Sequence, residues 1–427
     1  MKIDQSQLQD LNRDLLNEHR DQFDFLSQQL TKIDLEPDHI VSKIQALQVA
    51  IPSWALGAGG TRFGRFSTGG EPSCLEEKID DVGLLHALTQ AAGAISLHIP
   101  WDIPQDPMAI RERASMHGLA FDAVNSNTFQ DQPNQEHSYK FGSLCHTDAA
   151  VRAQAVKHNL EVISIGEALG SKSITVWLAD GSSFPGQLNF RTAYQHTKQA
   201  LQDIYASMPD DWKMYIEYKP YEPNFYSMVI PDWGTSLSLA QECGPNAYTL
   251  VDLGHHLPNT NIEQIVAILM MKGKLGGFHF NDSKYGDDDL TVGNVKPFQL
   301  FLIFNELIYG MDNNEANNPP LAWMIDASHN LKDPLEDLIQ SLEAILLAYA
   351  RALLVDREAL AQAQQENDVT RCQEILQTAF RRDVRPLLAE ARKRSNGALS
   401  PLNVYRQLKV RQRLIQERGS NVVATGL

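Results

Sequence analysis

Hydrophobic residues along the chain form short runs that alternate with longer amphipathic stretches. The runs have the length and composition of buried strands, and the eight of them occupy 49–56, 94–101, 119–125, 173–178, 212–217, 247–253, 276–280 and 321–326. The intervening stretches carry apolar residues at helical spacing, for example over 78–92, 147–169, 189–208, 232–243, 261–272, 297–310 and 334–353. Strand and helix therefore alternate through most of the sequence.

A strand followed by a helix, repeated eight times, is typical of a parallel (β/α)₈ TIM barrel, the α/β fold that we expect for residues 47–355. A doubly wound sheet is the alternative, but it usually has fewer strands and a glycine-rich first turn, which this sequence lacks. Residues 1–46 are polar, with Leu8, Leu11 and Leu15 at helical spacing. We therefore expect an N-terminal helical segment over 1–46 and a C-terminal helical extension for oligomer contacts over 356–427.

Composition and charge narrow the range of functions that the chain can have. The chain has 427 residues, 43% of them hydrophobic, and a net charge of −16, so it can bury a large core and is repelled by nucleic acid and by anionic membranes. The longest apolar runs have seven residues, against about 20 for a membrane-spanning helix. No signal peptide is visible, and the four cysteines form no CxxC pair, which predicts free thiols in the cytoplasm. We expect neither a nucleic-acid nor a membrane partner.

The C-terminal region differs in charge from the rest of the chain. Residues 381–418 contain eleven Lys and Arg against three acidic residues. No zinc finger, RNP or helix-turn-helix motif accompanies them, which disfavours nucleic-acid binding. We expect an arm that packs on an acidic neighbouring subunit.

The ends of the predicted strands carry the candidate chemistry, because barrel active sites lie at the carboxyl ends of the strands. Glu217 and Lys219 stand two residues apart, so they point together into the barrel mouth. The next three strands end at Asp252, His279 and Asp326. A single residue of this kind is usually a satisfied polar group, but four on consecutive strands predict a metal site.

A second cluster follows on adjacent loops, with His255, Asp287 and Asp289. Carboxylates and imidazoles without thiolates suit Mn²⁺, Co²⁺ or Mg²⁺ better than zinc or copper. We expect two metal ions per subunit that share Glu217. For the acidic run 287–289 taken alone, a solvated turn is the alternative.

Three aromatic residues, Trp101, Phe129 and Trp177, stand at or just past the ends of strands 2, 3 and 4. They predict either an apolar wall that grips substrate carbon and excludes water, or ordinary core packing. The residues Asn125, Ser126 and Asn127 after strand 3 offer groups that bind hydroxyls, with a turn role as the alternative.

At these motifs the sequence resembles L-rhamnose isomerase, in particular the broad-specificity bacterial type that also handles D-allose. The segments that carry the resemblance are IPSW at 51–54, GGTRF at 59–63, SLHIPWD at 96–102, NSNTF at 125–129, VDLGHH at 251–256 and GFHFNDSKYGDDD at 277–289. The likeness spans roughly residues 45–415. Two positions depart from the family pattern, Tyr218 where we expect His and Ala327 where we expect Gln.

The resemblance implies a metal-dependent aldose–ketose isomerase on a xylose-isomerase-like barrel, usually a homotetramer. By position, Glu217, Asp252, His279 and Asp326 match the structural metal ligands, whereas His255, Asp287 and Asp289, with Glu217 shared, match the catalytic site. Lys219 and His98 match residues that contact the sugar, and Trp101, Phe129 and Trp177 match the wall. Phe63 matches a residue that family members lend to the neighbouring subunit's site.

The implied reaction moves a hydrogen between C1 and C2 of the sugar and a proton between O1 and O2. His255 and Asp326 are placed to orient a proton-shuttling water, and Lys219 to hydrogen-bond a sugar oxygen. A metal-assisted hydride shift and a cis-enediol route with a carboxylate base both stay open. A barrel metallo-endonuclease acting on abasic DNA and a non-catalytic sugar-binding protein are the alternative functions.

Overall fold

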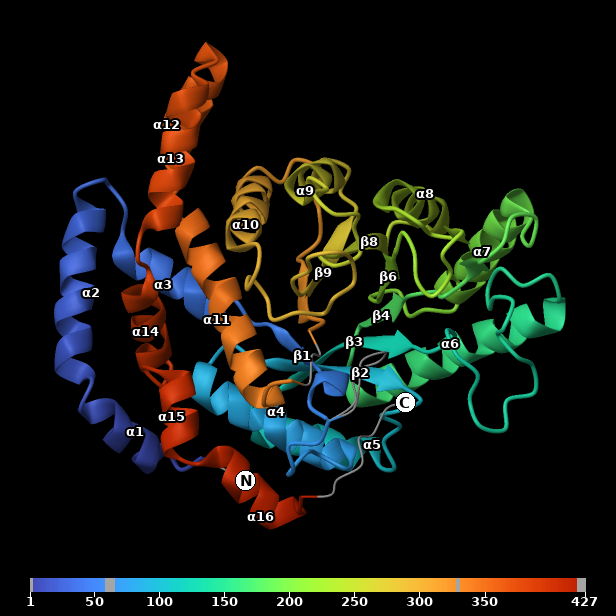
Figure 1. Ribbon diagram of the computed structural model, residues 1–427, viewed down its shortest axis with the longest axis horizontal. Helices are drawn as coiled ribbons and strands as arrows, with labels where there is room; N and C mark the ends of the chain where they lie inside the picture. The colour runs from blue at the N-terminus through green and yellow to red at the C-terminus, as the bar shows by residue number, and fades with distance from the viewer. Residues whose placement is uncertain (1–2, 58–65, 328–330, 421–427) are drawn as a thin grey trace.

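A closed barrel of eight parallel strands forms the centre of the molecule (Figure 1). The structure is a computed structural model that describes residues 3–57, 66–327 and 331–420. Around the barrel the strands follow the order β1, β10, β9, β8, β6, β4, β3, β2. Their bounds are β1 Ala50–Pro52, β2 Ala94–Ile99, β3 Ala120–Ser126, β4 Ser173–Val176, β6 Lys213–Glu217, β8 Ala247–Asp252, β9 Leu275–Phe280 and β10 Ala322–Ile325. Each overlaps one of the eight apolar runs, and β3 and β9 extend one residue beyond theirs, so the predicted TIM barrel is confirmed.

Each barrel strand is followed by a helix on the outside of the barrel. These helices are α4 Leu75–Thr89, α5 Pro107–Met116, α6 Ala149–Leu169, α7 Phe190–Tyr205, α8 Trp233–Cys243, α9 Ile262–Met271, α10 Pro297–Asp312 and α11 Pro334–Ala352. The sequence pattern did not predict α5, which is polar and buries only Ile110 and Ala114. Nor did it predict the small antiparallel sheet of β5 (Gly181–Ser182) and β7 (Ser227–Met228), which joins the loops after β4 and β6.

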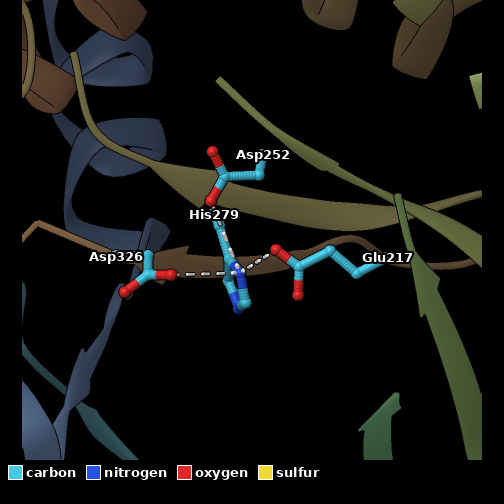
Figure 2. Close-up of side chains that lie close together, drawn as sticks. All are labelled: Glu217, Asp252, His279 and Asp326. Carbon is cyan, nitrogen blue, oxygen red and sulfur yellow. Dashed lines mark hydrogen bonds and ion pairs between the residues drawn. The ribbon is translucent and has the colours of Figure 1, made fainter. Parts of the chain in front are cut away.

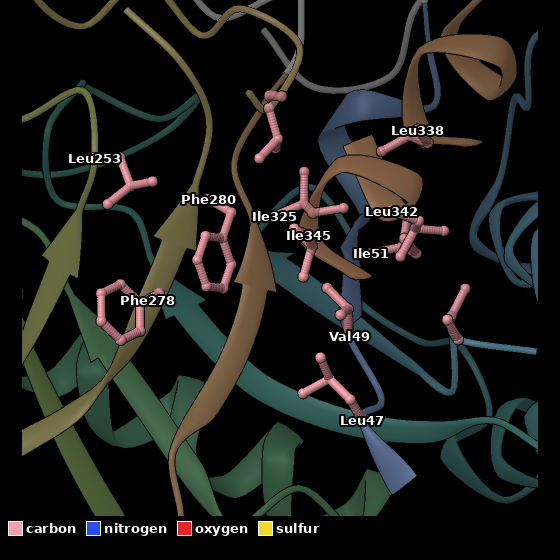
Figure 3. Packing of buried hydrophobic residues seen from close by; sticks show 14 of the residues in the cluster. Leu47, Val49, Ile51, Leu253, Phe278, Phe280, Ile325, Leu338, Leu342 and Ile345 are labelled. Carbon is pink, nitrogen blue, oxygen red and sulfur yellow. The ribbon is translucent and has the colours of Figure 1, made fainter. Parts of the chain in front are cut away.

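Side chains on the outer face of the strands form the main core with the helices. Figure 3 shows Phe278 and Phe280 of β9 and Ile325 of β10 in this layer, with Leu342 and Ile345 of α11. All five are buried and belong to one hydrophobic cluster. This layer fixes which face of each strand turns toward the barrel axis.

The inner face of the strands carries a separate, smaller cluster that includes Tyr215, Leu250 and Met324. Side chains along a strand alternate between its two faces. The residues two positions further on, at the strand ends, therefore also turn inward, and they are Glu217, Asp252 and Asp326. The period-two pattern of the sheet thus places three carboxylates at the barrel mouth.

Asp or Asn side chains begin six of the barrel helices. In each case the side-chain oxygen accepts a hydrogen bond from a backbone N–H of the first turn, an N-cap that satisfies otherwise unpaired donors. The capping residues are Asp106 of α5, Asp148 of α6, Asn189 of α7, Asp232 of α8, Asn261 of α9 and Asp333 of α11. These caps set where the loops at the barrel mouth end.

Helices precede and follow the barrel. They are α1 Gln5–Arg13, α2 Leu16–Thr31 and α3 Pro37–Ala46 before it, and α12 Arg357–Glu366, α13 Val369–Arg381, α14 Arg385–Arg394, α15 Pro401–Gln407 and α16 Val410–Arg418 after it. The α14 helix packs against α2 and α3, so the two terminal regions lie side by side. The α12–α13 hairpin projects from the body of the molecule (Figure 1).

The basic residues of the C-terminal helices pair with acidic residues of the same chain. Arg418 lies 2.8 Å from Asp81 of α4, and Arg411 lies 2.6 Å from Asp333 at the start of α11. The barrel helices of the same chain thus supply acidic partners for these two residues. The expected packing of the arm on a neighbouring subunit stays a prediction.

Among the described residues no single helix has both the length and the apolar composition needed to cross a membrane, and α11 and α12, which pass only together, are bent by 67° at their junction. All four cysteines have free thiols, as the sequence predicted.

A buried ion pair joins α4 to the barrel mouth. The Lys78 Nζ donates a hydrogen bond to Asp102 Oδ1 at 2.6 Å, and the two side chains are only 2% and 1% exposed. The other Asp102 oxygen accepts from the His98 backbone N–H at 2.9 Å and from the Ser53 hydroxyl. Asp102 therefore fixes the ends of β1 and β2, from which Trp54 and His98 extend into the site.

We predict that Lys78→Met lowers the free energy of unfolding by about 3 kcal/mol, because it leaves the Asp102 carboxylate buried without its countercharge. Arg13→Met is the control, since Arg13 pairs with Asp10 on the surface, where the loss should stay under about 1 kcal/mol. Urea denaturation of both variants measures the difference. Equal losses of unfolding free energy would show that the buried ion pair stabilises the fold no more than the surface pair does.

Candidate metal centre

Four residues from four neighbouring strands meet on the floor of the barrel mouth (Figure 2). They are Glu217 of β6, Asp252 of β8, His279 of β9 and Asp326 directly after β10, and one ligand atom from each lies within 4.8 Å of the others. His279 Nδ1 is 3.1 Å from Glu217 Oε1 and 3.7 Å from both Asp252 Oδ2 and Asp326 Oδ2. The sheet register places Asp252 opposite His279. The four residues predicted as the first metal site thus lie together.

Asp252, His255 and Asp287 form a second group of ligand atoms within 4.8 Å of one another. His255, in the turn after β8, has Nδ1 3.2 Å from Glu217 Oε1 and Nε2 3.3 Å from Asp287 Oδ2. Glu217 Oε1 therefore lies between two imidazoles. Asp252 also belongs to both groups, whereas the sequence analysis placed it only in the first.

Asp289 lies apart from both of these ligand groups. It is buried, lines the adjacent cavity and has a backbone φ of +47°. A φ in this left-handed region is uncommon for a residue other than glycine. Asp289, predicted as a ligand of the second cluster, thus lines the cavity but is not a member of either ligand group.

The two groups form the floor of a cavity of about 270 Å³. The predicted contact residues His98, Phe129, Trp177 and Lys219 line this cavity, as do Asn125 and Ser126. Phe129 and Trp177 meet edge to face with their ring centroids 4.9 Å apart. Trp101 is not among the lining residues and instead stacks on His98, with 4.1 Å between the ring centroids. Trp101 therefore packs against the His98 ring and does not form part of the cavity lining.

Several polar atoms along this cavity are buried without a hydrogen-bond partner among the described residues. They are Ser126 Oγ, Thr175 Oγ1, Trp177 Nε1 and His98 Nδ1. Buried polar atoms in proteins are nearly always paired. Burial also lowers the pKa of His98 to about 3, so its imidazole is neutral near pH 7. Residues that line the cavity therefore hold hydrogen-bonding capacity that no described residue uses.

The charges on the floor shift one another's protonation. Burial raises the pKa of Asp252 and of Asp326 above the usual range. Burial opposes protonation of His279, but the Glu217 carboxylate outweighs it and raises the His279 pKa to about 9. For Glu217 burial acts upward, but the neighbouring His279 and His255 hold its pKa well below its ordinary value. Four carboxylates, those of Glu217, Asp252, Asp287 and Asp326, lie here with two imidazoles and one ammonium, an excess of acidic groups.

Neighbouring donors orient the carboxylates of the floor. The Trp54 Nε1–H donates to Asp326 Oδ1 at 2.7 Å. Asp252 Oδ1 accepts from the Asn281 side-chain amide at 2.9 Å and from the Gly254 backbone N–H at 2.7 Å. Asp252 Oδ2 is buried, has no hydrogen-bond partner among the described residues and points to the cluster. Each carboxylate thus keeps one oxygen directed at the centre.

The residues fit a divalent cation. The donors are carboxylate oxygens and imidazole nitrogens without sulfur, the set preferred by Mn²⁺, Mg²⁺ and related ions. The unpartnered Asp252 Oδ2 and the excess negative charge are what a cation would satisfy. The buried cluster can therefore bind a metal.

The structure also places the residues that depart from the family pattern or that the sequence analysis did not assign. The Tyr218 hydroxyl meets His256 Nε2 at 2.6 Å, and Tyr218 does not line the cavity. Trp54 and Glu222 line the cavity but received no role from the sequence. Trp54 is visible in the IPSW motif, whereas no pattern marks Glu222. Phe63 lies outside the described residues.

Comparison with known proteins gives the class of this chain. It is 52% identical over 396 residues, 93% of this chain, to a protein of Rhizobium meliloti named as a probable sugar isomerase, of which it covers 92%. A second probable sugar isomerase, from Mesorhizobium japonicum, is 51% identical over 394 residues, covering 92% of this chain and 91% of that protein. The xylose isomerase of Thermus thermophilus is 26% identical over 254 residues, 55% of this chain and 64% of that enzyme.

Among solved structures, an L-ribulose 3-epimerase superposes with a TM-score of 0.52 at 15% identity, covering 76% of this chain and 98% of that one, which shows a shared barrel fold. No family model matches the chain. The chain belongs to the family of the two probable sugar isomerases, with a xylose-isomerase-like barrel. The expectation of a sugar isomerase is thereby confirmed at the level of the family.

We predict that Mn²⁺ raises the melting temperature of the metal-free protein by several degrees, because a ligand that binds only the folded state stabilises it. Asp252→Asn should abolish most of this shift, since Asp252 belongs to both ligand groups. Asp203→Asn, a surface change on α7, is the control and should keep the shift. Differential scanning calorimetry with and without EDTA measures it, and an equal shift in all three proteins would place the cation elsewhere.

Proposed function

We propose that this chain is a metal-dependent aldose–ketose isomerase that interconverts L-rhamnose and L-rhamnulose and also acts on D-allose, D-psicose and related sugars. The observation that carries the proposal is one cavity with two groups of metal ligands on its floor and Lys219 beside them. The choice of L-rhamnose as substrate rests on the motifs that resemble L-rhamnose isomerase, at 51–54, 59–63, 96–102, 125–129, 251–256 and 277–289.

The cavity suits a small polyhydroxylated substrate. Phe129 and Trp177 offer an apolar wall to the carbon chain, and the buried polar atoms of Ser126 and Thr175 can pair with hydroxyls. Neutral His98 can hydrogen-bond a further hydroxyl. The walls exclude water from the reacting carbons.

The metal site would take two Mn²⁺ ions, or Co²⁺ or Mg²⁺ in their place. Glu217, Asp252, His279 and Asp326 would hold one ion, and His255 and Asp287 with Asp252 and Glu217 the other. When bound, these ions would act as Lewis acids toward the adjacent hydroxyl and carbonyl oxygens of the sugar.

Three side chains have roles in proton transfer and charge. The Lys219 ammonium lies 5.4 Å from the centroid of the Trp177 ring and can donate to a sugar oxygen as negative charge develops there. Asp326 Oδ2 and His255 orient the water that carries the proton between O1 and O2. Trp54 holds Asp326 in place for this through its indole N–H.

Incubation of the protein with L-rhamnose and Mn²⁺ should yield L-rhamnulose. Exhaustive EDTA should abolish the activity, with Mn²⁺ or Co²⁺ restoring it better than Zn²⁺, and Lys219→Met should lower kcat by about 100-fold because one charge-stabilising donor is lost. Full activity in the metal-free protein would contradict the proposal. Binding without turnover would favour a sugar-binding protein, cleavage of abasic DNA an endonuclease, and epimerisation of the ketose alone an epimerase.

We also propose that the hydrogen moves between C1 and C2 without leaving the substrate. Most cavity carboxylates belong to the metal groups, and among the described residues Glu222 and Asp289 carry the only cavity carboxylates outside those groups. L-Rhamnose deuterated at C2 should therefore give L-rhamnulose labelled at C1. Nuclear magnetic resonance at early conversion measures the retention, and extensive exchange with water would instead require a carboxylate base.

We further propose a homotetramer in which Phe63 reaches the cavity of a neighbouring subunit. Phe63→Ala should raise KM for L-rhamnose by roughly tenfold, because the C6 methyl group loses an apolar partner. KM for D-allose, which carries a hydroxyl at C6, is the control and should change less. Sedimentation tests the assembly, and a fully active monomer at assay concentration would contradict the shared site.

A further inference from the structure

The ammonium of Lys219 lies between two carboxylates. Its Nζ is 2.6 Å from Asp287 Oδ2 and 3.3 Å from Glu222 Oε2. Lys219 and Asp287 are almost fully buried, with 4% and 6% of their side chains exposed, whereas Glu222 is 27% exposed at the rim of the cavity. Lys219 thus has a buried acidic partner, Asp287, and a partly exposed one, Glu222.

The buried partner, Asp287, also belongs to the second group of metal ligands. Asp287 Oδ2, the atom that accepts from Lys219, is 3.3 Å from His255 Nε2. A divalent cation held by Asp252, His255 and Asp287 would therefore share a carboxylate with the ammonium. Two positive charges at such close range repel strongly in a buried site, where water and salt screen them little.

We propose that Glu222 is a positioning residue that takes over the Lys219 ammonium when a cation occupies the group of Asp252, His255 and Asp287. The inference rests on the metal dependence proposed above and adds a role for a residue outside both ligand groups. With Glu222 as its partner, Lys219 stays beside Trp177 and the substrate cavity while Asp287 serves the cation.

The backbone around Glu222 supports this role. Glu222 has a φ of +68°, in the left-handed region that favours glycine. The Glu222 N–H donates to the Asn224 carbonyl at 3.0 Å, which closes a tight turn. The neighbouring Tyr221 hydroxyl donates to the Tyr285 carbonyl at 2.9 Å and so ties this turn to the loop that carries Asp287. The turn that carries Glu222 is therefore tied to the loop that carries Asp287.

Equilibrium binding of Mn²⁺ to the full-length metal-free protein tests the proposal without an activity assay. Electron paramagnetic resonance of the free ion gives the two dissociation constants, and Asp287→Asn identifies which of them belongs to the second group. Glu222→Gln should raise that constant by about tenfold, the size of a moderate charge coupling, and Glu222→Asp should restore part of it. Glu242→Gln is the matched control, because it breaks an ion pair with Lys198 on the outer surface.

The decisive comparison uses Lys219→Met, or Lys219→Gln where the first variant does not fold. Without the ammonium the proposed contact between Glu222 and Lys219 is lost, so Glu222→Gln should change the second constant by less than about twofold in this background. If Glu222→Gln raised the second dissociation constant equally with and without Lys219, Glu222 would act only as a distant negative charge, and the proposal would be overturned. No change of this constant in Glu222→Gln would overturn it as well. A wild-type protein that binds no Mn²⁺ would overturn the proposed metal dependence as well.

Discussion

The site depends on the burial of more negative than positive charge at one end of the barrel. Glu217, Asp252 and Asp326 meet around His279, and transfer of such charges out of water is costly unless an opposite charge is close. The raised pKa values of His279 and His255 show how strongly the cluster attracts positive charge. A divalent cation is the partner that this geometry and this set of donors suit best.

The surrounding structure fixes the orientation of the side chains in this cluster. Packing of Phe278 and Phe280 against the helices directs His279 inward, and the sheet register sets it beside Asp252. Trp54 then orients Asp326. Trp54 follows β1, whose end the buried Asp102 ties to β2 through Ser53 and the His98 backbone. The site is therefore assembled by elements from most of the barrel rather than by one loop.

The sequence predicted the barrel and the cluster of Glu217, Asp252, His279 and Asp326 at its mouth because both follow from one periodicity. Apolar runs of strand length mark the strands, and the rule that alternate residues share a face places Glu217 with Lys219. The same reasoning missed α5, because its polar face conceals the helical pattern. It did not assign Glu222, which lies in a turn with no periodicity, and it placed Trp101 on the cavity wall, whereas the tertiary packing stacks it behind His98. Pairings between distant segments, such as Arg418 with Asp81, leave no local pattern to read.

Anomalous X-ray diffraction from crystals grown with Mn²⁺ tests the central claim most directly, because the signal locates the ion itself. We expect two manganese peaks per chain. One should lie among Glu217, Asp252, His279 and Asp326, and the other beside His255 and Asp287. Crystals that show no manganese at these residues, with full isomerase activity in the same preparation, would contradict it.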